Sequence, residues 1–322
     1  MPIFVKQVTL ADFKADYLLL ERLDDIRKIM AEHGTFVQFP ALGQLPQAGS
    51  RRSYMVVQGT EAVYVERTIK AIMTLCGQFY IAVWWLLGEP SPNALMPSPS
   101  ANEVRDVMTD IAAYSGAEVS FSKNSFMFYG LDDDVKIALE QMNKIAFANC
   151  TPHQIRCKIE LAAEHKEFVS GKKNGKINKI MGNSNVQIMF ENFNEYDFFI
   201  DVSATKYDCA INGLALVEQE LPASVSFHVP DVYHKRIIGM GGQHIQRIMK
   251  KYSVFVKFTN AMELSHGDKD LNDMSKVDNV ICRTPARNAA NLEMVKGEIM
   301  DMVATAVGPS VAALDNMCTD FV

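Results

Sequence analysis

The sequence predicts an α+β protein built from four tandem modules of about 70 residues, each with the order strand–helix–helix–strand–strand–helix. Two observations lead to this fold class. A short apolar pattern recurs four times along the chain, and each copy is followed by a further strand-like and a further helical stretch. The 322 residues are 48% hydrophobic, which suffices for several cores and excludes a disordered or fibrous chain.

The recurring pattern is an isoleucine, a valine or isoleucine eight residues later, and a phenylalanine two residues after that. The four copies are Ile29–Val37–Phe39, Ile111–Val119–Phe121, Ile180–Ile188–Phe190 and Ile248–Val256–Phe258. Another apolar residue stands three positions before each leading isoleucine, and this spacing indicates the buried face of a helix. The later pair, two residues apart, lies on one face of a strand. Each copy therefore predicts a helix, a tight turn and a strand.

The segments around each copy complete the modules. The predicted first strands are Ile3–Val8, Phe79–Leu86, Gln154–Leu161 and Ser224–Val229; the last strands are Tyr54–Val57, Ser125–Tyr129, Tyr196–Val202 and Val280–Arg283; the last helices are Glu61–Leu75, Asp132–Phe147, Thr205–Glu220 and Ala286–Ala306. We expect modules at residues 1–77, 78–150, 151–222 and 223–308, with a tail at 309–322. Short connections predict rigidly abutted modules.

Composition excludes several classes of protein. The longest apolar run, Ile81–Leu87, is far shorter than the ~20 residues of a membrane helix. Charged residues near the N-terminus interrupt any signal-peptide core, so we expect an intracellular, cytoplasmic protein, with nuclear access left open. Six cysteines without a CxxC pair predict reduced thiols and no metal site. No nucleophile–base pair or paired carboxylates stand out, so we expect neither an enzyme nor a cofactor.

One loop carries a chemical signal. In the fourth module Gly239-Met240-Gly241-Gly242 joins two predicted helices. Glycines at the start of a helix leave its unpaired N–H groups accessible, so an anion can approach the backbone. A dinucleotide fingerprint would need a third glycine where His244 stands, and the Gly-Lys-Ser/Thr of a Walker loop is absent.

This loop and its flanks resemble the signature of the type I K-homology (KH) domain: Val229-Pro230, Lys235, Ile237-Ile238-Gly239, Gly242, Ile245 and Ile248. The third module is similar, with Gly171-Lys172-Lys173-Asn174, where asparagine replaces the second glycine and tolerates left-handed backbone. The multi-KH arrangement is similar to Bicaudal-C and vigilin-type proteins. The resemblance implies a three-stranded antiparallel sheet packed by three helices in each module. It also implies clamping of single-stranded RNA by the loops.

The expected RNA-binding residues lie around the two loops. In the fourth module they are Lys235, Arg236, Gly239, Met240, Gly241, Gly242, Gln243, Ile245 and Arg247; in the third they are Gly171, Lys172, Lys173, Asn174, Lys176 and Ile177. Although the chain carries a net charge of −6, residues 164–181 and 231–251 are locally basic. Ile238, Ile245 and Val256 resemble positions that line a KH groove against bases, and a plain core role is equally open for each.

The first two modules lack such a loop. Leu20 and Leu23, and in the second module Asn102 and Arg105, stand where the glycines would be. We therefore expect degenerate modules that brace the others or contact proteins.

Several alternatives stay open. The whole chain could be a protein-interaction scaffold with weak or no RNA affinity, or it could prefer single-stranded DNA. One of Trp84 and Trp85 is expected to be exposed, because neighbouring strand residues face opposite sides. The polar loop Asn260–Asn279 is expected to be disordered, with a less favoured role in selectivity.

Overall fold

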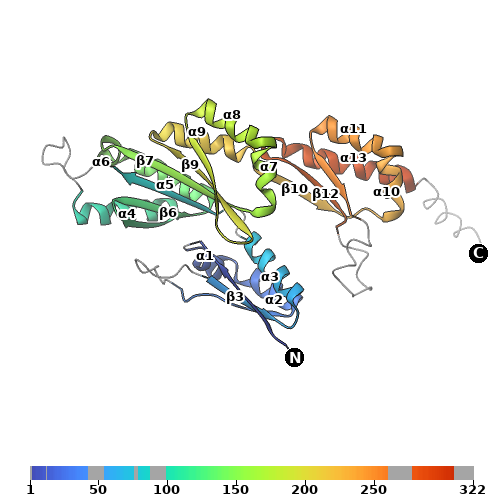
Figure 1. Cartoon of the computed structure of the whole chain (residues 1–322), viewed down its shortest axis with the longest axis horizontal. Coiled ribbons are helices and arrows are strands. Elements are labelled where there is room, and N and C mark those ends of the chain that lie inside the picture. The colour runs from blue at the N-terminus through green and yellow to red at the C-terminus, as the bar shows by residue number, and fades with distance from the viewer. Residues whose placement is uncertain are drawn as a thin grey trace, which may run out of the picture. The chain divides into compact units, whose positions relative to one another are not determined.

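The computed structural model (Figure 1) describes residues 2–11, 13–42, 54–75, 79–87, 99–259 and 278–307. The chain divides into two compact units, residues 1–217 and 218–322. The first unit contains three of the predicted modules and the second contains the fourth. Antiparallel sheets covered by helices confirm the α+β class.

The first module has the full predicted order of elements. They are β1 (Phe4–Thr9), α1 (Lys14–Glu21), α2 (Leu23–His33), β2 (Thr35–Gln38), β3 (Tyr54–Gly59) and α3 (Ala62–Leu75). The antiparallel sheet has the order β1-β3-β2. The repeat residue Val37 is buried in the core of this module, together with Ile26 from the preceding helix.

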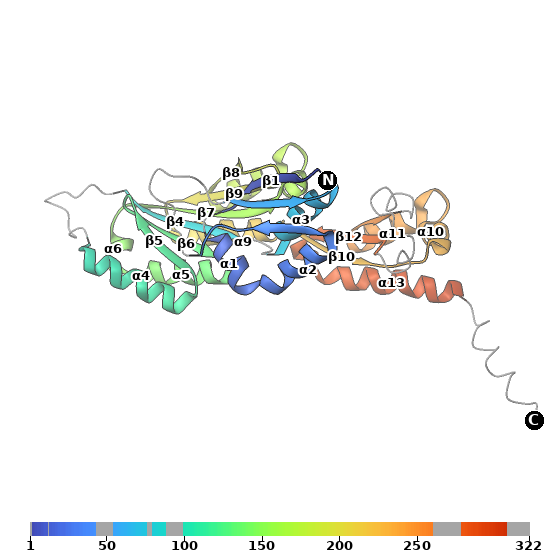
Figure 2. The same ribbon diagram turned by 90° about the horizontal axis from the view of Figure 1, so that it is seen from below.

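The second and third modules share one six-stranded sheet, with the order β5-β6-β4-β7-β9-β8 (Figure 2). The second module contributes β4 (Tyr80–Leu86), α4 (Ala101–Ser115), β5 (Glu118–Ser122), β6 (Ser125–Gly130), α5 (Asp132–Lys144) and α6 (Ala146–Cys150). The third contributes β7 (His153–Ala162), η1 (Ala163–His165), α7 (Lys166–Ser170), η2 (Lys172–Asn174), α8 (Gly175–Ser184), β8 (Gln187–Asn192), β9 (Asp197–Ala204) and α9 (Tyr207–Glu218).

Each of these two modules contributes three antiparallel strands, as expected, but the sequence did not indicate that the two sets join into one sheet. The first strands of the two modules, β4 and β7, pair antiparallel along seven residues of β4, from Tyr80 opposite Ile159 to Leu86 opposite His153. The second module differs in its helices as well. Of the described residues between β4 and β5, only those of α4 form a helix, and 88–98 lie outside the described part.

The alternation of β4 places its side chains on two faces, as expected for the tryptophan pair. Trp84 is fully buried and Trp85 is 43% exposed. The first module packs against the face that carries Ile81, opposite the face of Trp84. There Ala11 meets Phe79, Tyr129 and Phe199.

A buried ionic cluster joins the first module to the third. Lys14 Nζ on α1 lies 2.8 Å from Glu160 Oε1 on β7, and both side chains are almost completely buried. Asp197 on β9 is buried beside them. One oxygen each of Glu160 and Asp197 receives no hydrogen bond from a described donor. Burial, opposed by Lys14 and reinforced by Glu160, raises the pKa of Asp197 to about 7.

The fourth module has a three-stranded sheet of its own, with the order β10-β12-β11. Its elements are β10 (Pro222–Phe227), α10 (Asp231–Ile238), η3 (Met240–Gly242), α11 (Gln243–Tyr252), β11 (Phe255–Phe258), β12 (Val280–Pro285), η5 (Ala286–Asn288) and α13 (Ala290–Val307). Most of the predicted loop Asn260–Asn279 lies outside the described residues, as does the tail 309–322. The core gathers around Ile237, Ile248 and Val256.

No helix of the described chain is long and apolar enough to cross a membrane. The described residues also contain no group of three or more potential metal ligands of the His, Cys, Asp and Glu types. The four cysteines among the described residues carry free thiols. Cys157 and Cys282 are buried, where a thiol packs as a small apolar side chain.

Candidate nucleic-acid interface

The loop of the fourth module turns sharply at Gly239, directly after α10. This residue has φ +75° and ψ 171°, and its N–H donates to the carbonyl of Lys235. A Cβ atom here would lie 2.7 Å from Cγ of His244. Both the left-handed φ and the close approach require glycine at this position.

The next two glycines open the start of α11. Gly241 has φ +61° and Gly242 φ +78°, and the N–H of Gly242 donates to the carbonyl of Gly239 at 3.0 Å. No side chain caps the N-terminus of α11. A Cβ atom built at Gly241 would have no atom within 4 Å. The loop therefore leaves the N-terminal amides of a ten-residue helix beside open space, which suits an anion.

The loop of the third module has the same backbone without the same residues. Gly171 has φ +69° and ψ 175°, close to the values of Gly239. Lys173 and Asn174 have φ +54° and +57°, the left-handed region that Gly241 and Gly242 occupy. The N–H of Asn174 donates to the carbonyl of Gly171, as in the fourth module. The expectation that asparagine tolerates this conformation is confirmed.

In each loop, the side chain five positions after the first glycine contacts a backbone carbonyl of the preceding helix. This side chain is Lys176 in the third module and His244 in the fourth. Nζ of Lys176 donates to the carbonyl of Phe168 at 2.9 Å and lies 4.7 Å from the centre of its ring. His244 Nδ1 lies 3.4 Å from the carbonyl of Arg236, the equivalent position. The ammonium group of Lys176 is turned back onto α7, and the expected contact of this residue with RNA stays a prediction. No pattern in the sequence indicates this supporting contact.

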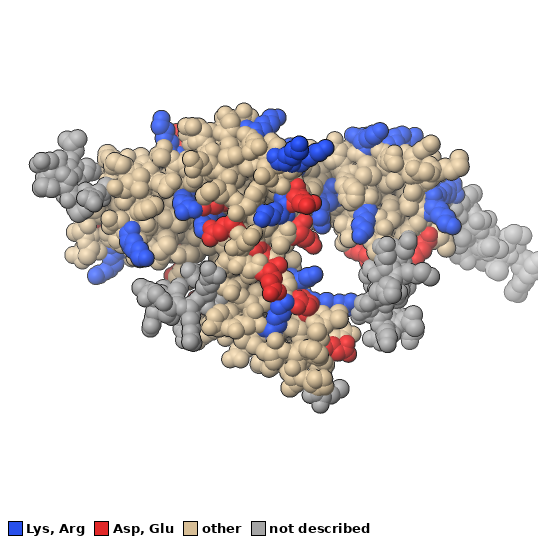
Figure 3. Space-filling model, in the orientation of Figure 1, with Lys and Arg blue, Asp and Glu red and all other residues tan. Residues whose placement is uncertain are grey.

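The other predicted polar contacts lie on the surface. The exposed residues are Lys172, Lys173 and Asn174 in the third module, and Lys235, Arg236, Met240, Gly241, Gln243 and Arg247 in the fourth. Figure 3 shows lysine and arginine side chains over the loop and α8 of the third module, and others over α10 and α11 of the fourth. Each loop thus has cations around the open N-terminus of a helix.

The predicted apolar contacts are mostly core residues. Ile177 is 2% exposed and Ile245 8% exposed, so each fixes its helix on the sheet and offers little surface. Val256 is similarly buried, whereas Ile238 is partly exposed at the end of α10. Their role against bases stays a prediction.

A buried polar network steadies the start of α10 and was missed by sequence reasoning. Asn279, at the entry to β12, donates to the carbonyl of Val229 at 2.7 Å and to Asp231 Oδ1 at 3.1 Å. His234 Nε2 lies 2.9 Å from the same carbonyl. The network holds the helix that leads into the glycine loop, and its residues lie up to 50 positions apart.

Among the described residues, the corresponding positions of the first two modules have no such opening. In the first module only Arg22 separates α1 from α2. In the second, Ser100 and Glu103 form a reciprocal capping box at the N-terminus of α4. The Glu103 carboxylate accepts a hydrogen bond from the N–H of Ser100, which lowers its pKa. A phosphate would meet a carboxylate there, as the sequence led us to expect.

Comparison with known proteins identifies the modules. Family models match three segments: a Mug60/KHD4 KH type I domain at residues 5–80, a YLL032C fifth KH domain-like model at 151–211, and a YLL032C fourth KH domain-containing model at 226–303. The chain contains KH domains. KH domains bind nucleic acids in general. The finer resemblance to Bicaudal-C and vigilin-type proteins stays a prediction.

Three fungal proteins are similar to this KH chain. K homology domain-containing protein 4 of Mycosarcoma maydis is 47% identical over 90% of the chain. Meiotically up-regulated gene 60 protein of Schizosaccharomyces pombe is 30% identical over 58%, and KH domain-containing protein YLL032C of Saccharomyces cerevisiae 35% over 47%. The chain spans 20%, 27% and 18% of their lengths, respectively.

Proposed function

We propose that this chain binds single-stranded RNA through the loops of its third and fourth KH modules, as part of post-transcriptional regulation of mRNA in the cytoplasm. The observation that carries the proposal is the common loop backbone. In both modules, left-handed residues bring an uncapped ten-residue helix to the surface beside exposed cations.

The two loops would hold the sugar-phosphate backbone by complementary means. In the fourth module the absence of side chains at Gly241 and Gly242 lets a phosphate approach the amides of α11. In the third module Lys172 and Lys173 supply positive charge directly at the turn. The unstacked bases would lie toward the edge strands β8 and β11, the outermost strands of their sheets.

Fluorescence anisotropy with labelled random-sequence single-stranded RNA tests this proposal. Met240→Asp/Gly241→Asp in the fourth module and Lys173→Asp in the third are each expected to weaken binding about tenfold, because they place carboxylates at the phosphate position. Lys123→Asp is the matched control. Lys123 is also an exposed lysine in the left-handed region, but it lies in the β5–β6 turn, away from any helix N-terminus.

Unchanged RNA affinity in a folded chain that carries both loop substitutions would overturn the proposal. An equal loss of RNA affinity in the Lys123→Asp chain would show that the loop substitutions act only through the net charge of the protein. Competition between matched RNA and DNA oligomers decides between RNA and single-stranded DNA, which would use the same loops.

The scaffold alternative is favoured by one observation: the described residues of the first two modules offer no glycine loop, because only Arg22 separates α1 from α2 and a capping box closes the start of α4. We propose that these two modules contact proteins while the other two hold RNA. Partners that stay bound after ribonuclease treatment would support this division, and their loss would contradict it.

A further inference from the structure

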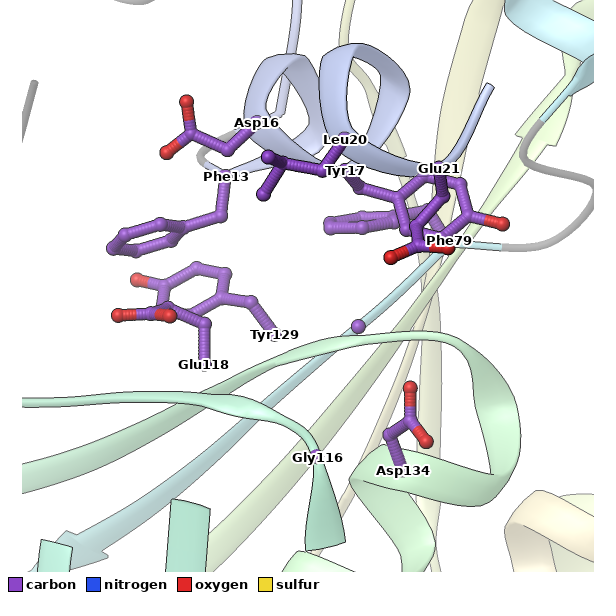
Figure 4. Close-up of a pocket in the computed structure, with 11 residues that line it drawn as sticks. Phe13, Asp16, Tyr17, Leu20, Glu21, Phe79, Gly116, Glu118, Tyr129 and Asp134 are labelled. Carbon is purple, nitrogen blue, oxygen red and sulfur yellow. The ribbon is translucent and has the colours of Figure 1, made fainter. Parts of the chain in front are cut away.

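A hollow lies between the first and second modules, within the first compact unit (Figure 4). Helix α1 forms one side, and the start of β5, the end of β6 and the start of α5 form the other. Its volume is about 190 Å³. Drug-sized ligands occupy about 300–1,000 Å³ and a water molecule about 30 Å³, so the hollow has room for one long side chain.

Aromatic rings form its walls. The rings of Phe13 and Tyr129 lie 4.8 Å apart, and Phe79 and Tyr17 line the same hollow. Figure 4 shows the Phe13 ring directly over that of Tyr129, with Leu20 beside them. Leu20 is 69% exposed, an unusual position for leucine that offers apolar contact to an entering side chain.

Carboxylates reach the hollow from both modules. Asp16 and Glu21 come from α1, whereas Glu118 and Asp134 come from β5 and α5. None of the described residues that line it is a lysine, arginine or histidine. Burial and the charge of Asp16 raise the pKa of Glu118, and burial also raises that of Asp134. Acidic side chains from both modules therefore face the same hollow, and their shared sign favours a cation as its occupant.

We propose that this acidic aromatic hollow binds an arginine side chain presented by a partner protein. A guanidinium group is planar, stacks on aromatic faces and donates to carboxylates in pairs. Four carboxylates repel RNA phosphates, which makes a basic polypeptide the occupant. The residues that define the acidic pocket are Phe13, Asp16, Glu21, Glu118, Tyr129 and Asp134. It is built by the two modules that lack a phosphate-binding loop.

The test is a titration of the full chain with a fluorescein-labelled Gly-Arg-Gly-Arg-Gly peptide and a matched peptide in which neutral citrulline replaces arginine. The double variant Asp16→Asn/Glu118→Gln removes one pocket carboxylate from each module. Asp106→Asn/Asp110→Asn is its control: both residues are exposed acids of the second module outside the pocket, and the net charge changes equally.

We expect the arginine peptide to bind the wild-type and control chains equally, and the pocket variant about tenfold more weakly. The citrulline peptide should bind the wild-type chain about tenfold more weakly than the arginine peptide. Phe13→Leu should weaken binding about threefold through loss of the ring. RNA affinity should not change in the pocket variant, which separates this site from the RNA-binding loops.

Three outcomes would overturn the proposal. One is equal binding of the citrulline and arginine peptides, and another is an equal loss in the control chain. The third is self-association of the wild-type chain that the pocket substitutions abolish, because the occupant would then be a second copy. Sedimentation of the wild-type and variant chains detects this last case.

Discussion

The third and fourth modules place the same loop in different surroundings. The fourth has its own three-stranded sheet, whereas the third shares a sheet with the second module and contacts the first through a buried ion pair. Lys173 and Asn174 take up the left-handed conformation that glycines adopt in the fourth module. The two flanking helices therefore set the backbone of the loop. The residues at these positions determine how much free energy the left-handed conformation costs and which charges the loop exposes.

Replacing the buried Lys14 should change the difference in stability between the two units more than any other substitution proposed here. Lys14→Met leaves Glu160 and Asp197 buried without their partner, and we expect the first unit to lose about 3–5 kcal/mol of unfolding free energy. The fourth module lies in the other unit and should keep its stability. Hydrogen exchange followed by mass spectrometry reads the two units separately.

Lys28→Met is the control for this prediction. Lys28 also pairs with a carboxylate, that of Asp25, but its side chain is 72% exposed, so its loss should cost less than about 1 kcal/mol. Equal protection in the Lys14→Met and wild-type chains would show that the pair does not hold the first module in place.

The second-largest expected effect is a dependence of the unfolding free energy on pH in the first unit, which contains Asp197. Because the pKa of Asp197 is about 7 in the folded chain and lower when unfolded, the folded state binds the proton more tightly. Its stabilising contribution is complete below about pH 4 and is lost as the pH rises to about 7. Asp197→Asn should remove this loss and leave the first unit more stable than wild type at pH 8 by a few kcal/mol.

Urea unfolding between pH 4 and pH 8 measures this dependence, with the exposed Asp133→Asn as control. A wild-type slope that persists in the Asp197→Asn chain would assign the titration to another group.

The smallest predicted effect concerns the loop itself. Lys173→Gly relieves the left-handed strain of a lysine and should raise the unfolding free energy by about 1 kcal/mol. It also removes a cation from the turn, so RNA binding should weaken a few-fold. Lys123→Gly should give the same stabilisation without any change in RNA affinity, since it relieves similar strain far from the loop. Parallel thermal unfolding and anisotropy titrations compare both chains.

Local signals in the sequence predicted the order of elements in the first, third and fourth modules, the glycine loop and the left-handed asparagine. Alternation along one strand was enough to separate Trp84 from Trp85. Two features lay beyond such signals. The pairing of β4 with β7 depends on the edges of two different modules, and Lys14 meets a partner 146 positions away. The contact of Lys176 with Phe168 was also not predicted, because a lysine in a basic loop is ordinarily expected to point into solvent.

The pairing of β4 with β7 bears on how the protein can be divided for study. A fragment that begins at residue 151 would expose the whole edge of β7, with its N–H and C=O groups unpaired. Such edges recruit other strands, so the isolated third module would tend to aggregate or to pair with a copy of itself. Residues 79–217 therefore form the smallest piece in which the lysine-bearing loop keeps its native sheet.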